Sequence, residues 1–141
     1  MLNEIEGNTP MQMSDFPPDT FKIRTVEAGD IIFLEGQPAD NAYVILRGVA
    51  EVVVQDASGQ TIPINRMKPG ELFGELAILT DAKVRTATVM AAEKCELIEI
   101  KRDVFEGRLG KADPLLRFML DHVCRRLVKL TEQVLGENNR R

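Results

Sequence analysis

The sequence predicts a mainly β fold, a jelly roll or barrel, with a short N-terminal arm and two C-terminal helices. Between residues 21 and 100, short apolar runs rich in β-branched residues alternate with corners that contain glycine. The segment Asp-Ala-Ser-Gly-Gln at 56–60 separates two of these runs and is typical of a hairpin turn. After residue 101 the apolar spacing changes to that of helices. Many short strands followed by helices indicate a jelly roll with helices attached.

Five segments contain the expected strands, and the residues before them are expected to form the arm. The strand segments read DIIFLEG, AYVILRGVAEVVV, TIPINRM, RTATVMA and CELIEI. Within residues 1–20, Pro17 and Pro18 forbid a continuous helix, so we expect a loose or partly helical arm. A chain of 141 residues supports one domain with one core. We expect this domain over 21–135, with the jelly roll over 21–100, helices over 101–135 and a tail over 136–141.

The last predicted helix is long and carries an apolar seam. Asp113 is expected as its N-cap and Pro114 in its first turn. Apolar residues then recur in alternating steps of four and three, as in a coiled coil: Leu116, Leu120, Val123, Leu127, Leu130 and Val134. The seam could pack on the barrel alone, but Leu115, Phe118 and Met119 widen the apolar surface. We therefore expect a homodimer through Leu116–Val134.

Charge argues against nucleic acid as a partner. The chain has a net charge of −4, whereas nucleic-acid binding depends on a basic face. Its basic residues gather on the long helix and at the C-terminus, as Arg125, Arg126, Lys129, Arg140 and Arg141, and acidic residues are interspersed among them. This pattern is typical of a solvated helix face.

The sequence also predicts where the chain resides. No apolar run is long enough to span a membrane, and the N-terminus MLNEIEGNTP has acids where a signal peptide has bases. Cys95 and Cys124 make neither a metal-ligand spacing nor a disulfide framework. We expect a cytoplasmic protein without membrane insertion.

Catalysis is not indicated. The single histidine, His122, lies on the long helix, so neither a metal centre nor a Ser-His-Asp arrangement can be built around it. Paired carboxylates for hydrolysis are not apparent. We expect no enzyme, no metal and no cofactor.

The most informative stretch is GELFGELAILTDAKVRTATVMA, residues 70–91. Gly74 can turn the backbone sharply and open a helix whose free N–H groups attract an anion. Ala77 leaves room for a phosphate, and Arg85 supplies a cationic fork for it. Glu75 would repel a phosphate but would accept a hydrogen bond from a ligand hydroxyl. With Thr86 as a further hydroxyl, the residues indicate a small cyclic phosphate ester; the alternative is a surface ion pair of little energetic value.

The motif FGELAI, followed after six intervening residues by RTATVMA, resembles the phosphate-binding cassette of the cyclic nucleotide-binding domain family. Upstream, AGDIIFLEGQPADNAYVILRGVAEVVV resembles the first strands of that family, with its turn glycines at Gly29, Gly36 and Gly48. The resemblance implies a jelly roll flanked by helices. It also implies that Glu75 binds the ribose 2′-hydroxyl and that Arg85 binds the cyclic phosphate. The remaining residues of the implied site are Phe73, Gly74, Leu76, Ala77, Thr86 and Ala87.

The tail DPLLRFMLDHVCRRLVKLTEQV is similar to the long dimer helix of the bacterial catabolite activators in this family. The resemblance implies that Arg126, Leu130 and Thr131 face the purine. Leu130 falls where those activators have a hydroxyl residue, so its hydrogen bond to adenine is lost or taken over by Thr131. The resemblance includes no helix-turn-helix, so no DNA-reading element is expected.

The resemblance leaves the nucleotide open between cAMP and cGMP. In eukaryotic members a hydroxyl residue at the position of Thr86 accompanies cGMP, whereas bacterial members with one commonly bind cAMP. The helix resemblance favours cAMP. The predicted function is a stand-alone cAMP sensor that changes the pose of its C-terminal helix toward an unidentified effector protein. The alternatives are an excised regulatory domain of a channel, kinase or transcription regulator, and a dimerising protein that binds no nucleotide.

Overall fold

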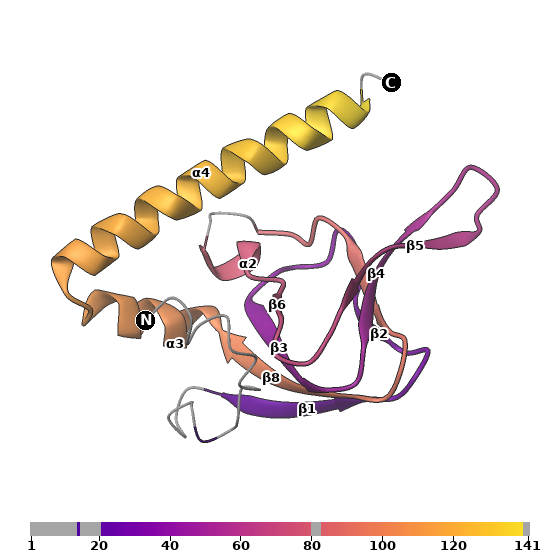
Figure 1. Cartoon of the computed structure of the whole chain (residues 1–141), viewed down its shortest axis with the longest axis horizontal. Helices are drawn as coiled ribbons and strands as arrows, with labels where there is room; N and C mark the ends of the chain where they lie inside the picture. The colour runs from indigo at the N-terminus through magenta and orange to yellow at the C-terminus, as the bar shows by residue number, and fades with distance from the viewer. Residues whose placement is uncertain (1–13, 15–20, 80–82, 140–141) are drawn as a thin grey trace, which may run out of the picture.

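Two antiparallel sheets form the body of the protein (Figure 1). The computed structural model describes residue 14, residues 21–79 and residues 83–139, with side chains as far as residue 130. The strands are β1 Lys22–Val26, β2 Ile31–Phe33, β3 Asn41–Arg47, β4 Ala50–Gln55, β5 Thr61–Met67, β6 Leu72–Phe73, β7 Thr88–Ala91 and β8 Cys95–Lys101. One sheet has the order β1-β8-β3-β6 and the other β2-β7-β4-β5. The prediction of a mainly β jelly roll is confirmed. The predicted arm lies outside the described residues, apart from Ser14.

The core lies between the two sheets. Its members come from both sheets and alternate along their strands, as a two-layer β fold requires; they include Phe33, Tyr43, Ile45, Met67, Phe73, Val89 and Leu97. On β3, Tyr43 and Ile45 belong to this cluster, whereas Ala42 and Val44 are buried outside it. The helices that follow β6 and β8 pack on β3 and β8, which explains why β3 is buried on both faces.

Gly48 lies at the corner between β3 and β4, where no other residue type fits. Its φ is +90°, and a Cβ built on it would lie 2.2 Å from the carbonyl oxygen of Lys94. Only glycine adopts this conformation without strain, and here it also lets two backbone segments meet. The glycine predicted at the corner between β3 and β4 therefore allows β8 to pass beside it.

Three helices are described: α2 Leu76–Leu79, α3 Arg102–Gly110 and α4 Pro114–Asn139. Asp113 caps α4 as predicted, because its Oδ1 accepts a hydrogen bond of 2.8 Å from the N–H of Leu115. The helix continues to Asn139, past the predicted end at 135. Gly136 does not end it, since a glycine inside a helix costs only about 1 kcal/mol. Among the described helices, none is both long and apolar enough to cross a membrane.

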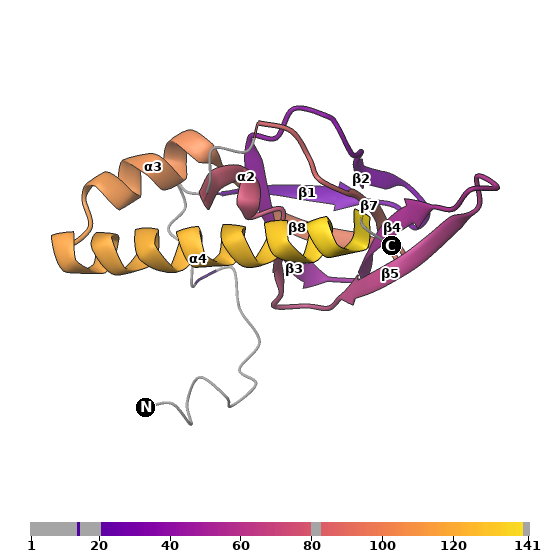
Figure 2. The ribbon, with the colours of Figure 1, turned by 90° about the horizontal axis from the view of Figure 1, so that it is seen from above.

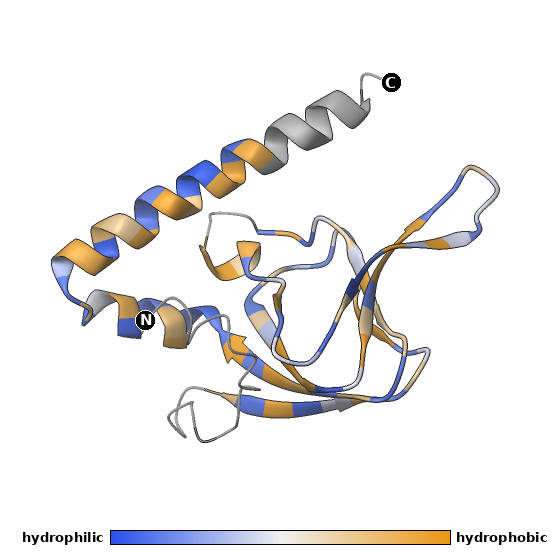
Figure 3. Cartoon of the chain, in the orientation of Figure 1, coloured by the Kyte–Doolittle hydropathy of each residue, from blue (hydrophilic) through white to orange (hydrophobic). Residues whose placement is uncertain are grey.

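The long helix α4 runs across the sheets at a distance, and α2 lies between the helix and the sheets (Figures 1 and 2). Of its described side chains only Cys124 is buried. The predicted seam is exposed, with Leu116 at 63%, Val123 at 59% and Leu130 at 59%. Hydrophobic residues recur along the helix in Figure 3 without a layer of protein over them. Leu116, Val123 and Leu130 of the seam therefore present apolar surface to solvent in the single chain.

Candidate functional site

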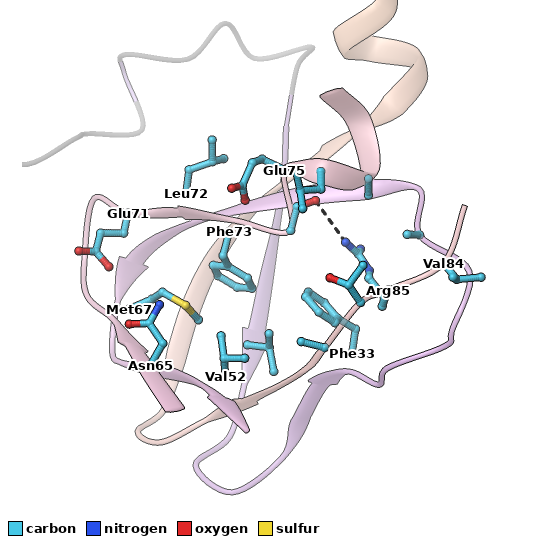
Figure 4. A pocket seen from close by; sticks show the side chains of 17 residues that line it. Phe33, Val52, Asn65, Met67, Glu71, Leu72, Phe73, Glu75, Val84 and Arg85 are labelled. Atoms are coloured by element: carbon cyan, nitrogen blue, oxygen red, sulfur yellow. Dashed lines mark hydrogen bonds between the residues drawn. The ribbon is translucent and has the colours of Figure 1, made fainter. Parts of the chain in front are cut away.

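A cavity of about 420 Å³ opens between the α2 segment and the strands β4, β5 and β6 (Figure 4). The structure brings to it every residue that the sequence motif singled out: Phe73, Gly74, Glu75, Leu76, Ala77, Arg85, Thr86 and Ala87. A volume of this size fits one small organic ligand. The motif thus forms a continuous wall rather than two separate surface features.

Gly74 lets the arginine approach the backbone. Its φ is +70°, and a Cβ there would lie 2.9 Å from Nη1 of Arg85 and 3.4 Å from the Phe33 ring. Without that Cβ, Nη1 of Arg85 donates a hydrogen bond of 3.3 Å to the Gly74 carbonyl oxygen. The same carbonyl accepts a bond of 3.3 Å from the N–H of Ala77, which begins the single turn of α2. Gly74 therefore joins the two halves of the motif.

Arg85 is the one buried charged side chain among the described residues, with 6% of its surface exposed. Its Nη2 donates a hydrogen bond of 2.5 Å to Oδ1 of Asn41, and its Cζ lies 4.0 Å from the centre of the Phe33 ring. Its Nε is buried without a hydrogen-bond partner in the described residues. Burial lowers the pKa of the guanidinium from its ordinary value, while Tyr43 and Glu99 act in the opposite direction. The group remains a cation.

The backbone of Arg85 is held by the loop between β2 and β3. Its N–H donates to the carbonyl of Gln37, and its carbonyl accepts from the N–H of Gly36, both at 2.8 Å. Asn41, which holds the guanidinium, follows this loop and donates from Nδ2 to Oε1 of Glu99. Sequence analysis did not identify Asn41 or Glu99, because no local spacing links them to the motif. Together they fix both the position and the direction of the arginine.

Glu75 faces the same cavity and does not pair with Arg85. Its side chain is half-buried and makes no hydrogen bond or ion pair with a described residue. The alternative of a surface ion pair between Glu75 and Arg85 is therefore wrong: the arginine is buried and the two groups do not touch. The cavity wall thus carries two separate groups: the Glu75 carboxylate, which can accept hydrogen bonds, and the buried Arg85 guanidinium, which can donate them.

The opposite part of the cavity is largely apolar. Val52, Met67 and Leu72 line it, with the amide of Asn65 beside them (Figure 4). Sequence analysis did not single out these residues, although their strands were predicted. Such a surface can accommodate a flat aromatic ring.

The three residues predicted to face a base lie on α4. Arg126 and Leu130 are exposed and do not line the cavity in the single chain, and the side chain of Thr131 lies outside the described part. Their contact with a ligand stays a prediction. Within residues 21–79 and 83–130, no group of three His, Cys, Asp or Glu side chains could hold a metal ion.

Comparison with known families decides what kind of domain this is. Residues 23–111, more than half of the chain, match the model of the cyclic nucleotide-binding domain. The chain belongs to the cyclic nucleotide-binding domain family. The resemblance predicted from the cassette motif is thereby confirmed, and residues of that motif line the cavity.

Curated relatives of the domain are regulatory proteins. The cAMP-dependent protein kinase regulatory subunit of Aspergillus fumigatus is 37% identical over 64% of this chain and 21% of its own length. The cAMP-activated global transcriptional regulator CRP of Pasteurella multocida is 26% identical over 70% of this chain and 47% of its own length. The chain thus spans between about a fifth and a half of these relatives.

Solved structures share the fold. The half-site-occupied form of EAL enzyme Bd1971 superposes with a TM-score of 0.69 and 27% identity, covering 79% of this chain and 98% of that chain. The catabolite activator protein of Thermus thermophilus gives a TM-score of 0.61 and 27% identity, over 84% of this chain and 52% of that one.

Proposed function

We propose that the chain binds a 3′,5′-cyclic nucleotide, with the cyclic phosphate on Arg85 and the ribose 2′-hydroxyl on Glu75. The observation that carries the proposal is the buried Arg85, whose Nε has no partner among the described residues and whose charge is paired with no described carboxylate. A buried unpaired cation is costly, so a bound anion would relieve that cost. The family membership supports a cyclic phosphate as that anion.

The carboxylate of Glu75 restricts the class of ligand further. An ionised carboxylate can only accept hydrogen bonds, so Glu75 suits a ligand hydroxyl and repels a second phosphate. A ligand that presents a hydroxyl next to a single phosphate fits both groups. A nucleotide whose phosphate is closed on its own sugar has this form, and the apolar wall at Val52 and Met67 suits its base.

We propose cAMP as the physiological ligand and cGMP as the weaker one. The named relatives are cAMP-dependent or cAMP-activated regulators, which supports this preference. The comparisons do not decide it, because EAL enzyme Bd1971 is known in both a cAMP-bound and a cGMP-bound form. Thr86 lies at the cavity and is compatible with either nucleotide.

The proposed output is a change in the pose of α4, in a cytoplasmic protein without catalytic activity. The exposed seam of α4 supports a homodimer, because eight described apolar side chains from Leu115 to Leu130 are at least 37% exposed. The helices meet the cassette at α2, which contacts both α3 and α4. A nucleotide that pulls on the cassette would favour one pose of α4 over another and so alter the surface offered to an effector protein.

Calorimetry with cAMP and with cGMP tests the proposal. Arg85→Ala should weaken cAMP binding roughly ten- to a hundredfold, because it removes a charge-assisted contact of about 1.5–3 kcal/mol. Arg85→Lys keeps the charge but not the fork, so its affinity should fall between those of the wild type and Arg85→Ala.

Arg66→Ala is the matched control, because Arg66 is exposed on β5, pairs with Glu51 at 3.7 Å and does not line the cavity. Its affinity for cAMP should equal that of the wild type. Absence of both heat and thermal shift with either nucleotide would contradict the proposal and favour the nucleotide-free dimerising alternative. An unchanged affinity of folded Arg85→Ala for cAMP would show that the phosphate does not bind Arg85.

A further inference from the structure

Asn65 is a polar side chain on the wall of the cavity that lies across from Arg85 (Figure 4). It pairs with Val52 across the β4–β5 ladder, so the two side chains lie on the same face, toward the cavity. The side-chain amide of Asn65 makes no hydrogen bond with any described side chain or backbone group. It therefore offers one donor group and one acceptor to whatever fills this part of the cavity.

Asn65 and its neighbour Ile64 on β5 differ in whether they line the cavity. In TIPINRM both residues are exposed in the single chain, Ile64 at 59%, but of the two only Asn65 lines the cavity. A register irregularity lies beside Asn65, between its pairing partner Val52 and Val53 on β4. Such strand irregularities are over-represented next to ligand and active sites.

The position of Asn65 follows from where the rest of the ligand must lie. If the phosphate is on Arg85 and the sugar on Glu75, the base extends toward Val52, Met67 and Asn65. Glu71 is the other polar side chain on that wall, and it is already engaged, because its Oε2 accepts a hydrogen bond of 3.1 Å from the N–H of Lys68. Asn65 is thus the available group for reading the base.

We infer that Asn65 binds the N6/N7 edge of adenine and thereby selects adenine over guanine, an inference that rests on the proposed function. The amide oxygen accepts from the N6 amino group while the amide nitrogen donates to N7, a bidentate pair. Guanine presents two acceptors, O6 and N7, on the same edge, so it leaves the amide oxygen of Asn65 unsatisfied. The specificity of the chain is thus set on β5, within a single protomer.

The test measures affinities for cAMP, cGMP and 7-deaza-cAMP, which has a carbon in place of N7. The wild type should prefer cAMP over cGMP by roughly five- to a hundredfold, the range for one bidentate base contact. Asn65→Leu, similar in size but without polar atoms, should lose most of this preference. The 7-deaza ligand should bind the wild type more weakly than cAMP and bind Asn65→Leu equally well, because the coupled pair is then absent.

Two variants keep the test independent of folding. Asn65→Asp retains an acceptor for the amino group but has no donor, so it should lose only its sensitivity to the 7-deaza change. Ile64→Ala, on the same strand but pointing to solvent, should leave all three affinities unchanged. A wild type that prefers cGMP, or an Asn65→Leu variant with the wild-type ratio of affinities, would overturn the inference while leaving cyclic nucleotide binding intact. A wild type that binds no nucleotide would overturn the proposed function and this inference with it.

Discussion

The end of the cavity around Arg85 and the long helix α4 differ in how far their side chains find contacts within one chain. Arg85 is held through its backbone by Gly36 and Gln37 and through its side chain by Asn41 and Gly74. On α4, by contrast, Leu116, Val123 and Leu130 are more than half exposed. In the first region neighbouring residues hold Arg85 in place, whereas the second presents apolar surface to solvent.

This difference suggests a division of labour in the proposed sensor. A preorganised site loses little entropy on binding, so it can bind its ligand tightly. A helix with few internal contacts can adopt more than one pose at little cost, so ligand binding can bias it. The predictions below separate the two regions, because each change should affect one of them and leave the other intact.

The largest effect is expected at the α4 seam. Leu116→Asp combined with Val123→Asp should raise the dimer dissociation constant on the order of a thousandfold or more, because four apolar side chains leave a two-fold interface at about 1.5–3 kcal/mol each. Monomer stability should change by less than about 1 kcal/mol, since both side chains are 63% and 59% exposed in the single chain. Sedimentation equilibrium measures the first quantity and chemical unfolding the second.

Ile64→Asp is the control for the seam variant. Ile64 has the same exposed fraction as Val123, 59%, but lies on β5. It should leave the oligomeric state unchanged. A wild type that is monomeric at millimolar concentration, or equal dissociation in both variants, would contradict dimerisation through α4.

The next largest effect is expected at Gly74. Gly74→Ala should weaken cAMP binding roughly tenfold or more, because the new Cβ would meet Nη1 of Arg85 at 2.9 Å and displace the guanidinium. Gly70→Ala also places an alanine at a positive φ, +89°, but with nothing within 4 Å of the new Cβ. Calorimetry of both variants isolates the displacement of Arg85 from backbone strain. Equal affinities in the two would show that Gly74 matters only for the turn.

How much of this could be predicted from the sequence depends on distance along the chain. Gly74, Glu75 and Arg85 lie within a short motif whose chemistry is legible locally, and the structure gathers them at one cavity. Asn41 and Glu99 are separated from Arg85 and from each other by long stretches of chain and meet only through the pairing of β3 with β8. Local spacing carries no record of such pairing.

Asn65 was missed for a different reason. An alternating pattern normally places apolar residues toward the core, and that rule would have placed Ile64 inside and Asn65 outside. In the structure both residues are exposed, and Asn65, beside the irregularity between Val52 and Val53, lines the cavity. The helices were easier, because the Asp113 cap and the apolar period are local signals; only the end of α4 differed, since Gly136 does not end it.

The smallest effect is expected at Arg102, which connects the two regions. It begins α3, its N–H donates a hydrogen bond of 2.9 Å to the carbonyl of Asp40, and its Nε lies 3.8 Å from Oδ1 of that residue. Its Nη2 donates to the carbonyl of Ala77 in α2. Arg102 therefore touches the cassette on one side and the residue before Asn41 on the other, at the point where the chain leaves β8 for the helices.

Arg102→Ala should lower cAMP affinity only about three- to tenfold, because hydrogen bonds of about 1 kcal/mol are lost and Arg85 itself keeps its partners. Its larger consequence should be in communication. In the wild type, cAMP should slow amide exchange in α2 and also in α3, whereas in Arg102→Ala the slowing should persist in α2 and disappear from α3. Lys101→Ala, one residue earlier and exposed, should behave as the wild type. If cAMP still protects α3 in Arg102→Ala, the two regions are coupled through the contact between α2 and α4 instead. Arg102 would then not be needed to connect the cassette with the helix.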